Sequence, residues 1–146
     1  MKGQIKKLGV AALALVLLIA GCATPAEDSG LNTPLNGILQ SSNAGSVTID
    51  VEWAGTGENS ITFSVSMDTH SVELDSYNLG ELTVLRDDAG NEYLPLSWDA
   101  VPGGHHRQGT LTFPLPPTLD QGTARYIEMV INDVAGIAQR VLTWQL

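Results

Sequence analysis

Apolar and polar residues alternate strictly along two stretches of the chain, residues 47–53 and 61–67. In both stretches the odd-numbered positions are apolar, which is the pattern of a β-strand with one buried face. We expect Phe63, at the centre of the second stretch, and Ile127, in a later one, to be fully buried. Five further strands are expected over residues 81–86, 92–98, 110–115, 125–132 and 136–144.

The number and spacing of these segments predict the fold class. Seven short strands in about 100 residues, with a turn about every 8–12 residues, indicate an all-β, Greek-key β-sandwich of immunoglobulin type. The loop at 87–91, Asp-Asp-Ala-Gly-Asn, has the composition of a hairpin turn. No segment after Gly45 shows helical periodicity over three turns. The paired cysteines of antibody domains are absent, so the prediction rests on strand number and spacing.

The N-terminal segment differs from the rest of the chain. Residues 1–7 contain every lysine, residues 8–20 are almost entirely apolar, and two small residues then precede Cys22. This order is typical of a secretory signal peptide. The apolar run is shorter than the roughly 20 residues of a membrane-spanning helix, and it lacks the polar face of a half-buried core helix. We therefore expect a signal-peptide helix over residues 1–21.

Ile19-Ala20-Gly21-Cys22 closes the apolar run and resembles the lipobox of bacterial lipoproteins. The resemblance implies that Cys22 becomes the first mature residue, carries a lipid on its sulfur and is acylated on its new amino group. Several acyl chains hold a small domain stably on a membrane. Ala23 follows, where an aspartate would indicate inner-membrane retention in a Gram-negative cell. The resemblance thus implies a cell-envelope protein, at the outer membrane of a Gram-negative bacterium or otherwise at the outer face of the plasma membrane.

A linker separates the predicted anchor from the predicted domain. Residues 23–45 are rich in Ser, Asn, Thr, Gly, Pro and Ala and show no periodicity, which is the composition of a flexible linker. We expect a lipidated flexible tether over residues 22–45 and the sandwich over residues 46–146. Within the sandwich, Gly90-Asn91-Glu92-Tyr93, a Gly-rich loop and Leu111-Thr112-Phe113-Pro114 follow one another. This succession is similar to immunoglobulin-like domains common in bacterial lipoproteins.

Charge and cysteine content exclude several function classes. After residue 7 the chain has four arginines and sixteen acidic residues, a formal charge of −12. So acidic a surface repels phosphate backbones, and we expect no nucleic-acid partner. Cys22 is the only cysteine, which excludes a disulfide, a catalytic thiol and a cysteine metal cluster from the mature domain. The sequence contains no nucleophile elbow, phosphate-binding glycine loop or zinc-protease motif, so we expect no enzyme.

The three histidines are the best candidates for a binding site. His70 follows the second predicted strand, and His105 and His106 precede the fifth. These two strands are antiparallel neighbours in an immunoglobulin-type sandwich, so all three histidines should lie at one end. With Asp68 and Glu73 nearby, they offer a ligand set suited to Zn²⁺ or Cu²⁺. The alternative is that His70 caps a turn and the other two belong to an ordinary loop.

Two functions therefore remain open at the level of sequence. The first is a membrane-anchored, extracytoplasmic lipoprotein whose β-sandwich is a non-catalytic module that binds a protein partner. The alternative is a cell-envelope protein that binds Zn²⁺ or Cu²⁺ through His70 and His106, with His105 as a third ligand if its loop turns it inward. No other cofactor is expected.

Overall fold

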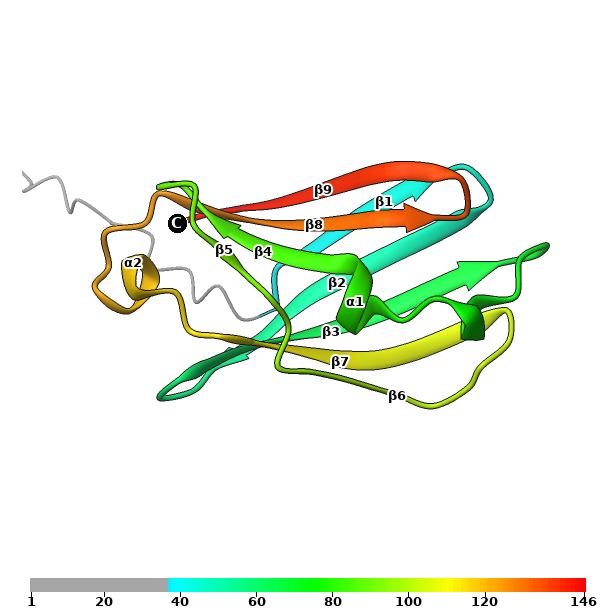
Figure 1. The fold of residues 1–146 in the computed structure, drawn as a ribbon, viewed down its shortest axis with the longest axis horizontal. Coiled ribbons are helices and arrows are strands. Elements are labelled where there is room, and N and C mark those ends of the chain that lie inside the picture. Colours follow the sequence, from blue (N-terminus) through cyan, green and yellow to red (C-terminus); the bar gives the residue numbers. More distant parts are fainter. Residues whose placement is uncertain (1–36) are drawn as a thin grey trace, which may run out of the picture. The chain divides into compact units, whose positions relative to one another are not determined.

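Two antiparallel β-sheets face each other in the computed structural model, which describes residues 37–146 (Figure 1). The larger sheet has the strand order β1-β2-β3-β7-β6, formed by Leu39–Ala44, Val47–Thr56, Ser60–Thr69, His106–Pro114 and Ser97–Ala100. The smaller sheet has the order β5-β4-β8-β9, formed by Glu92–Tyr93, Thr83–Asp87, Tyr126–Val134 and Ile137–Gln145. Three short helical segments connect strands, namely η1 (Leu74–Ser76), α1 (Leu79–Leu82) and α2 (Pro117–Asp120). The predicted all-β sandwich is confirmed.

The strand order is that of a seven-stranded immunoglobulin-like domain with two strands added. The order β2-β3-β7-β6 corresponds to strands A, B, E and D, and β4-β8-β9 corresponds to C, F and G. β5 extends the second sheet beside β4, and β1 extends the first beside β2. The predicted pairing of the second and fifth strands is confirmed, because β3 and β7 are antiparallel neighbours.

Residues Leu39–Ala44 form a strand, although the sequence places them in the tether. β1 pairs with β2 from Leu39 opposite Glu52 to Ala44 opposite Val47. Its sequence, Leu-Gln-Ser-Ser-Asn-Ala, lacks an apolar face because every residue of this edge strand is exposed or half-buried. The ordered domain therefore begins before residue 46. The predicted signal peptide, Cys22 and the first part of the predicted tether lie outside the described residues.

The strand predicted over residues 92–98 is two strands in two different sheets. β5 pairs with β4 in the smaller sheet, whereas β6 pairs with β7 in the larger one. Pro95 lies between them and has no backbone N–H for a ladder. The preceding strand also begins later than expected, at Thr83, because Glu81 belongs to α1, whose first turn is capped by Asn78.

An aromatic cluster fills the core between the sheets. The Phe63 ring centroid lies 5.7 Å from that of Trp53, 6.0 Å from that of Phe113 and 5.0 Å from that of Trp144. Phe63 and Ile127 are both 0 % exposed, as the alternation predicts. Within residues 37–146, none of the helices has the length and apolar composition required to cross a lipid bilayer.

Candidate functional site

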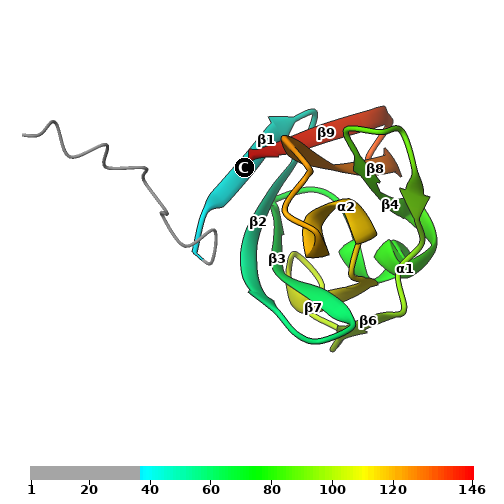
Figure 2. The ribbon, with the colours of Figure 1, turned by 90° about the vertical axis from the view of Figure 1, so that its left-hand side faces the viewer.

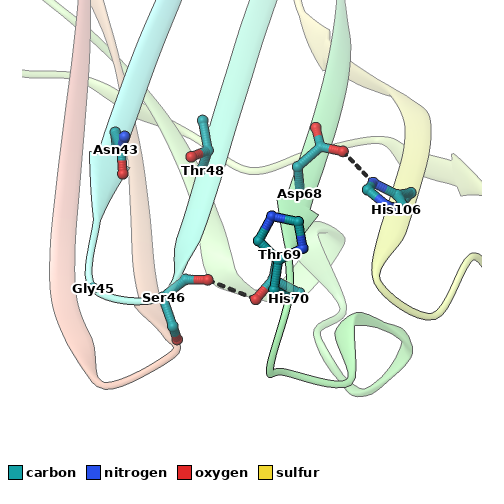
Figure 3. Close-up of a pocket in the computed structure, with 8 residues that line it drawn as sticks. All are labelled: Asn43, Gly45, Ser46, Thr48, Asp68, Thr69, His70 and His106. Atoms are coloured by element: carbon teal, nitrogen blue, oxygen red, sulfur yellow. Dashed lines mark hydrogen bonds and ion pairs between the residues drawn. The ribbon is translucent and has the colours of Figure 1, made fainter.

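A polar pocket of about 260 Å³ opens at one end of the sandwich (Figure 3). It lies where the β1–β2 turn, the end of β3 and the start of β7 meet. Its lining residues are Asn43, Gly45, Ser46, Thr48, Asp68, Thr69, His70 and His106. We call it the His70–His106 pocket. Two of the three histidines and one of the two acidic residues proposed from the sequence are therefore brought together.

Strand pairing positions Asp68 opposite His106. The two residues are register partners in the β3–β7 ladder, and Nδ1 of His106 lies 2.6 Å from Oδ1 of Asp68. Because an ionised carboxylate can only accept hydrogen bonds, Nδ1 is the donor. Figure 3 shows the Asp68 carboxylate turned toward His106, with the His70 imidazole nearby. The pairing leaves Nε2 of His106 as the ring nitrogen available to a ligand.

The surroundings of Asp68 favour its ionised form. The hydrogen bond from His106 lowers the pKa of Asp68, as does a hydrogen bond from Ser66 Oγ at 3.0 Å to the other carboxylate oxygen. The nearby imidazoles of His106 and His70 act in the same direction, and partial burial opposes them. The side chains of Asp68 and His106 are 45 % and 70 % exposed, so water screens this pair and it adds little to stability.

The loop before β7 is held firmly against η1. The carboxylate of Asp75 accepts hydrogen bonds from the backbone N–H groups of Gly103 (2.8 Å) and Gly104, while the Gly104 carbonyl accepts from Leu74. A Cβ atom on Gly103 would collide with the carbonyl oxygen of His106. The position of His106 is thus fixed by contacts of its own loop.

Arg107 stabilises the same region from inside the sandwich. Its guanidinium donates to the carbonyl oxygens of Leu74 (3.1 Å) and Tyr77 (2.7 Å) and lies 5.7 Å from the ring centroid of Trp98. Its Nε lies 3.7 Å from Asp75 Oδ1. Sequence reasoning missed this residue. The inward parity of positions 107, 109, 111 and 113 along β7 was the available signal.

His105 and Glu73 take no part in the pocket. The backbone carbonyl of His105 accepts from the N–H of Thr69 at 3.0 Å, and its side chain is exposed. The carboxylate of Glu73 caps η1 by accepting from the N–H of Asp75 at 3.3 Å. Among residues 37–146 the structure contains no group of three or more His, Cys, Asp or Glu side chains arranged to hold a metal ion.

A second polar cluster lies at the opposite end of the sandwich and is closed to ligands. Asp87 is 1 % exposed, and its carboxylate accepts hydrogen bonds from the backbone of Ala89, the backbone and side chain of Asn91, and the hydroxyls of Tyr93 and Thr118. Burial raises the pKa of Asp87, but these hydrogen bonds outweigh it and lower the pKa to about 2. Sequence reasoning treated this carboxylate as part of a plain hairpin turn. The inward parity of β4, with Thr83 and Leu85, was the signal that could have found it.

Comparison with known proteins assigns no relative to this chain. No protein-family model, curated protein or solved structure matches it. Functional inference therefore rests on the sequence and on the geometry of the domain.

Proposed function

We propose that this protein is a membrane-anchored, extracytoplasmic lipoprotein whose immunoglobulin-like sandwich is a non-catalytic binding module. The lipobox-like Ile19-Ala20-Gly21-Cys22 supports the anchor. The position of the His70–His106 pocket in the domain is the observation that best supports a binding role. β1 runs from Leu39 to the β1–β2 turn that lines the pocket, so the pocket lies at the end of β1 that is far from Leu39 (Figure 1). A pocket at the end of a sandwich, lined by polar side chains, is suited to binding a ligand.

The pocket offers several unused hydrogen-bonding groups. Within the part of the chain that the structure describes, the side chains of Asn43, Thr48 and His70 make no hydrogen bond to another residue. His106 adds its Nε2 to this set. These groups suit a ligand with hydroxyl, amide or carbonyl groups better than an apolar ligand.

The direction of the hydrogen bonds around Asp68 favours a binding role over nucleophilic catalysis. In a catalytic triad, Nδ1 of a histidine donates to an aspartate, and a nucleophilic hydroxyl donates to Nε2 of the same histidine. Here the hydroxyl of Ser66 donates to Asp68 itself. The arrangement therefore orients His106 without activating a nucleophile.

Palmitate labelling tests the anchor. Cells that express the full chain and cells that express Cys22→Ser would be grown with radiolabelled palmitate, and the protein would be partitioned between detergent and water. We expect label and detergent partition for the wild type, and an unprocessed, unlabelled precursor for the variant. A wild-type protein without label would refute the lipoprotein assignment.

Divalent-metal binding is the second candidate function, favoured by the shared pocket of His70 and His106. A carboxylate that fixes Nδ1 of a histidine while Nε2 binds metal is a common outer-shell arrangement, and Asp68 stands in that position toward His106. The resulting site would hold Zn²⁺ or Cu²⁺ through two imidazoles and leave positions open to water or a partner.

Calorimetry with Zn²⁺ and Cu²⁺ tests this second function on protein without a histidine tag. We expect His70→Ala and His106→Ala each to abolish most of the binding, and His105→Ala, the exposed histidine outside the pocket, to leave it intact. Acidification should weaken binding, because protons compete with the metal for the imidazole nitrogens. No heat at micromolar metal would reject the metal function.

A further inference from the structure

The most exposed apolar side chains gather in one short segment. Leu94, Leu96 and Val101 are 70 %, 63 % and 75 % exposed, more than any other large apolar residue in the described part of the chain. They fall within eight residues that include the whole of β6. We call residues 94–101 the β6 flank. Exposed apolar side chains that lie together are typical of interaction surfaces.

The β6 flank also lies at the edge of a sheet. β6 is the outer strand of the larger sheet and β5 is the outer strand of the smaller one, and residues 94–96 pass between them. Figure 2 shows β6 and this crossing on one side of the sandwich, while β1 lies beside β9 on another. An edge strand offers N–H and C=O groups on which an added strand can pair.

Packing against β7 and α1 holds β6 in place. The Trp98 side chain is half-buried and lies over Gly109 of β7, where a Cβ atom would come within 2.7 Å of the indole. On the other side α1 packs against β6, with Gly80 leaving room for the Cβ of Trp98. A preformed edge loses little conformational entropy when it binds.

The charge of the domain selects the kind of partner. Residues 37–146 contain fourteen acidic residues and four arginines. None of the four arginines is a free surface charge. Arg86 and Arg125 form ion pairs with Glu92 and Asp88, and the other two, Arg107 and Arg140, are buried. Glu81 and Asp99, which are exposed on α1 and β6, make no ion pair with another described residue. A second copy of this chain would bring like charges together, whereas a basic segment would neutralise them.

We propose that the β6 flank binds an extended, basic segment of a partner protein, which pairs with β6 as an additional strand. Apolar side chains of the segment contact Leu96 and Val101, and its Lys or Arg side chains lie near Glu81 and Asp99. The inference rests on the proposal that the sandwich is a binding module, and it names a surface separate from the His70–His106 pocket. It does not depend on the lipid anchor.

The test measures binding of a dye-labelled peptide of alternating valine and lysine to the full chain in neutral detergent, by fluorescence anisotropy. We expect saturable binding that weakens with salt. Replacing valine by serine, replacing lysine by glutamate, or methylating every second backbone nitrogen should each remove it. Equal binding of the serine-substituted or N-methylated peptide would overturn the proposal, because it would show charge attraction without apolar contact or strand pairing. Equal binding of the glutamate peptide would overturn it as well, because the acidic residues would then play no part.

Matched variants locate the surface. Leu96→Ser and Val101→Ser should each weaken peptide binding at least about tenfold, whereas Leu39→Ser, the same kind of change on β1, should leave it unchanged. Equal effects from the three variants would overturn the proposal. So would a dimer of the full chain that Leu96→Ser dissociates, or binding of the flank to phosphatidylcholine vesicles. Failure of the β6 proposal would leave palmitate labelling and metal binding unchanged, because neither involves residues 94–101.

Discussion

Asp87 and Asp68 show how similar side chains serve different purposes in this domain. Both carboxylates have lowered pKa values, and both accept hydrogen bonds from side chains. Asp87 is buried, and both of its oxygens accept hydrogen bonds from the surrounding loop and from α2. Asp68 is close to half exposed and orients an imidazole whose Nε2 is available. The first is a structural group and the second belongs to a surface that can bind.

Asp87 should make the stability of the domain depend on acid pH. Its pKa is about 2 in the folded state and roughly 3.9 in an unfolded chain. This difference corresponds to about 2–3 kcal/mol of unfolding free energy at neutral pH. Because the folded pKa is the lower one, this stabilisation is complete above about pH 4 and is lost as the pH falls toward about 2. Asp87→Asn should therefore cost about 1–3 kcal/mol at pH 7, and less near pH 2.

Urea unfolding at several pH values measures this difference. Asp133→Asn is the matched control, because Asp133 is exposed and asparagine also tolerates its positive φ of 54°. If the gap between wild type and Asp87→Asn is the same at pH 7 and pH 2, the buried hydrogen bonds do not act on the ionised carboxylate.

Phe63 tests the aromatic core at the scale of one residue. Phe63→Ala removes a ring that contacts three other aromatic rings and should lower the unfolding free energy by about 3–5 kcal/mol. Ser64→Ala, on the opposite face of the same strand, should change it by less than about 0.5 kcal/mol. Thr62 is a poorer control because its hydroxyl donates to the carbonyl of Gly55. Similar losses for Phe63 and Ser64 would mean that the ring does not anchor the core.

Individual residues differ in how well the sequence predicts their place. Phe63 and His106 could be placed because alternation fixes the face of a strand and the fold class fixes its neighbour. Arg107 and Asp87 could not be placed in this way, because a charged side chain in a strand is expected to be exposed to solvent. Their burial depends on carbonyl and hydroxyl partners that are distant in sequence.

At the scale of elements, a single arginine connects β1 to the opposite sheet. Arg140 of β9 is 3 % exposed, and its guanidinium donates to the backbone carbonyls of Ser42, Ala44 and Val47 at 2.8–3.1 Å. Burial lowers its pKa, but an arginine remains protonated at physiological pH. Arg140 therefore fastens the β1–β2 turn of one sheet to a strand of the other.

Arg140→Met should loosen β1 more than the rest of the domain. Without the guanidinium, hydrogen exchange of the amides in residues 39–44 should accelerate by about tenfold or more, while exchange in the β3–β7 ladder changes less. Arg125→Met is the matched control, since that arginine is 79 % exposed and pairs with Asp88 at the surface. Unchanged exchange in β1 would show that pairing with β2 holds the strand without help from Arg140.

The elements that the sequence predicts least well are those at the sheet edges. Long central strands such as β3 and β8 bury one face, so their alternation is visible. β1 buries neither face, and β5 and β6 are short pieces divided by Pro95. Edge strands owe their structure to main-chain pairing with a neighbour, which leaves little pattern in their own side chains.

At the scale of the whole domain, the two ends of the sandwich differ in what they carry. One end holds the buried hydrogen bonds of Asp87 and the indole N–H of Trp144, which donates to the carbonyl of Ile38, and it has a smaller pocket of about 170 Å³ between the β2–β3 turn and α2. The other end carries the open His70–His106 pocket.

Intact-mass spectrometry of the protein isolated from membranes is the most direct test, because the proposed role depends on attachment through Cys22. We expect a mature chain that begins at Cys22 and carries diacylglycerol on sulfur and an acyl chain on its amino group. Cys22→Ser should yield a heavier polypeptide without lipid that retains residues 1–21. A wild-type chain that begins at Met1, or that is cleaved elsewhere and carries no lipid, would contradict it.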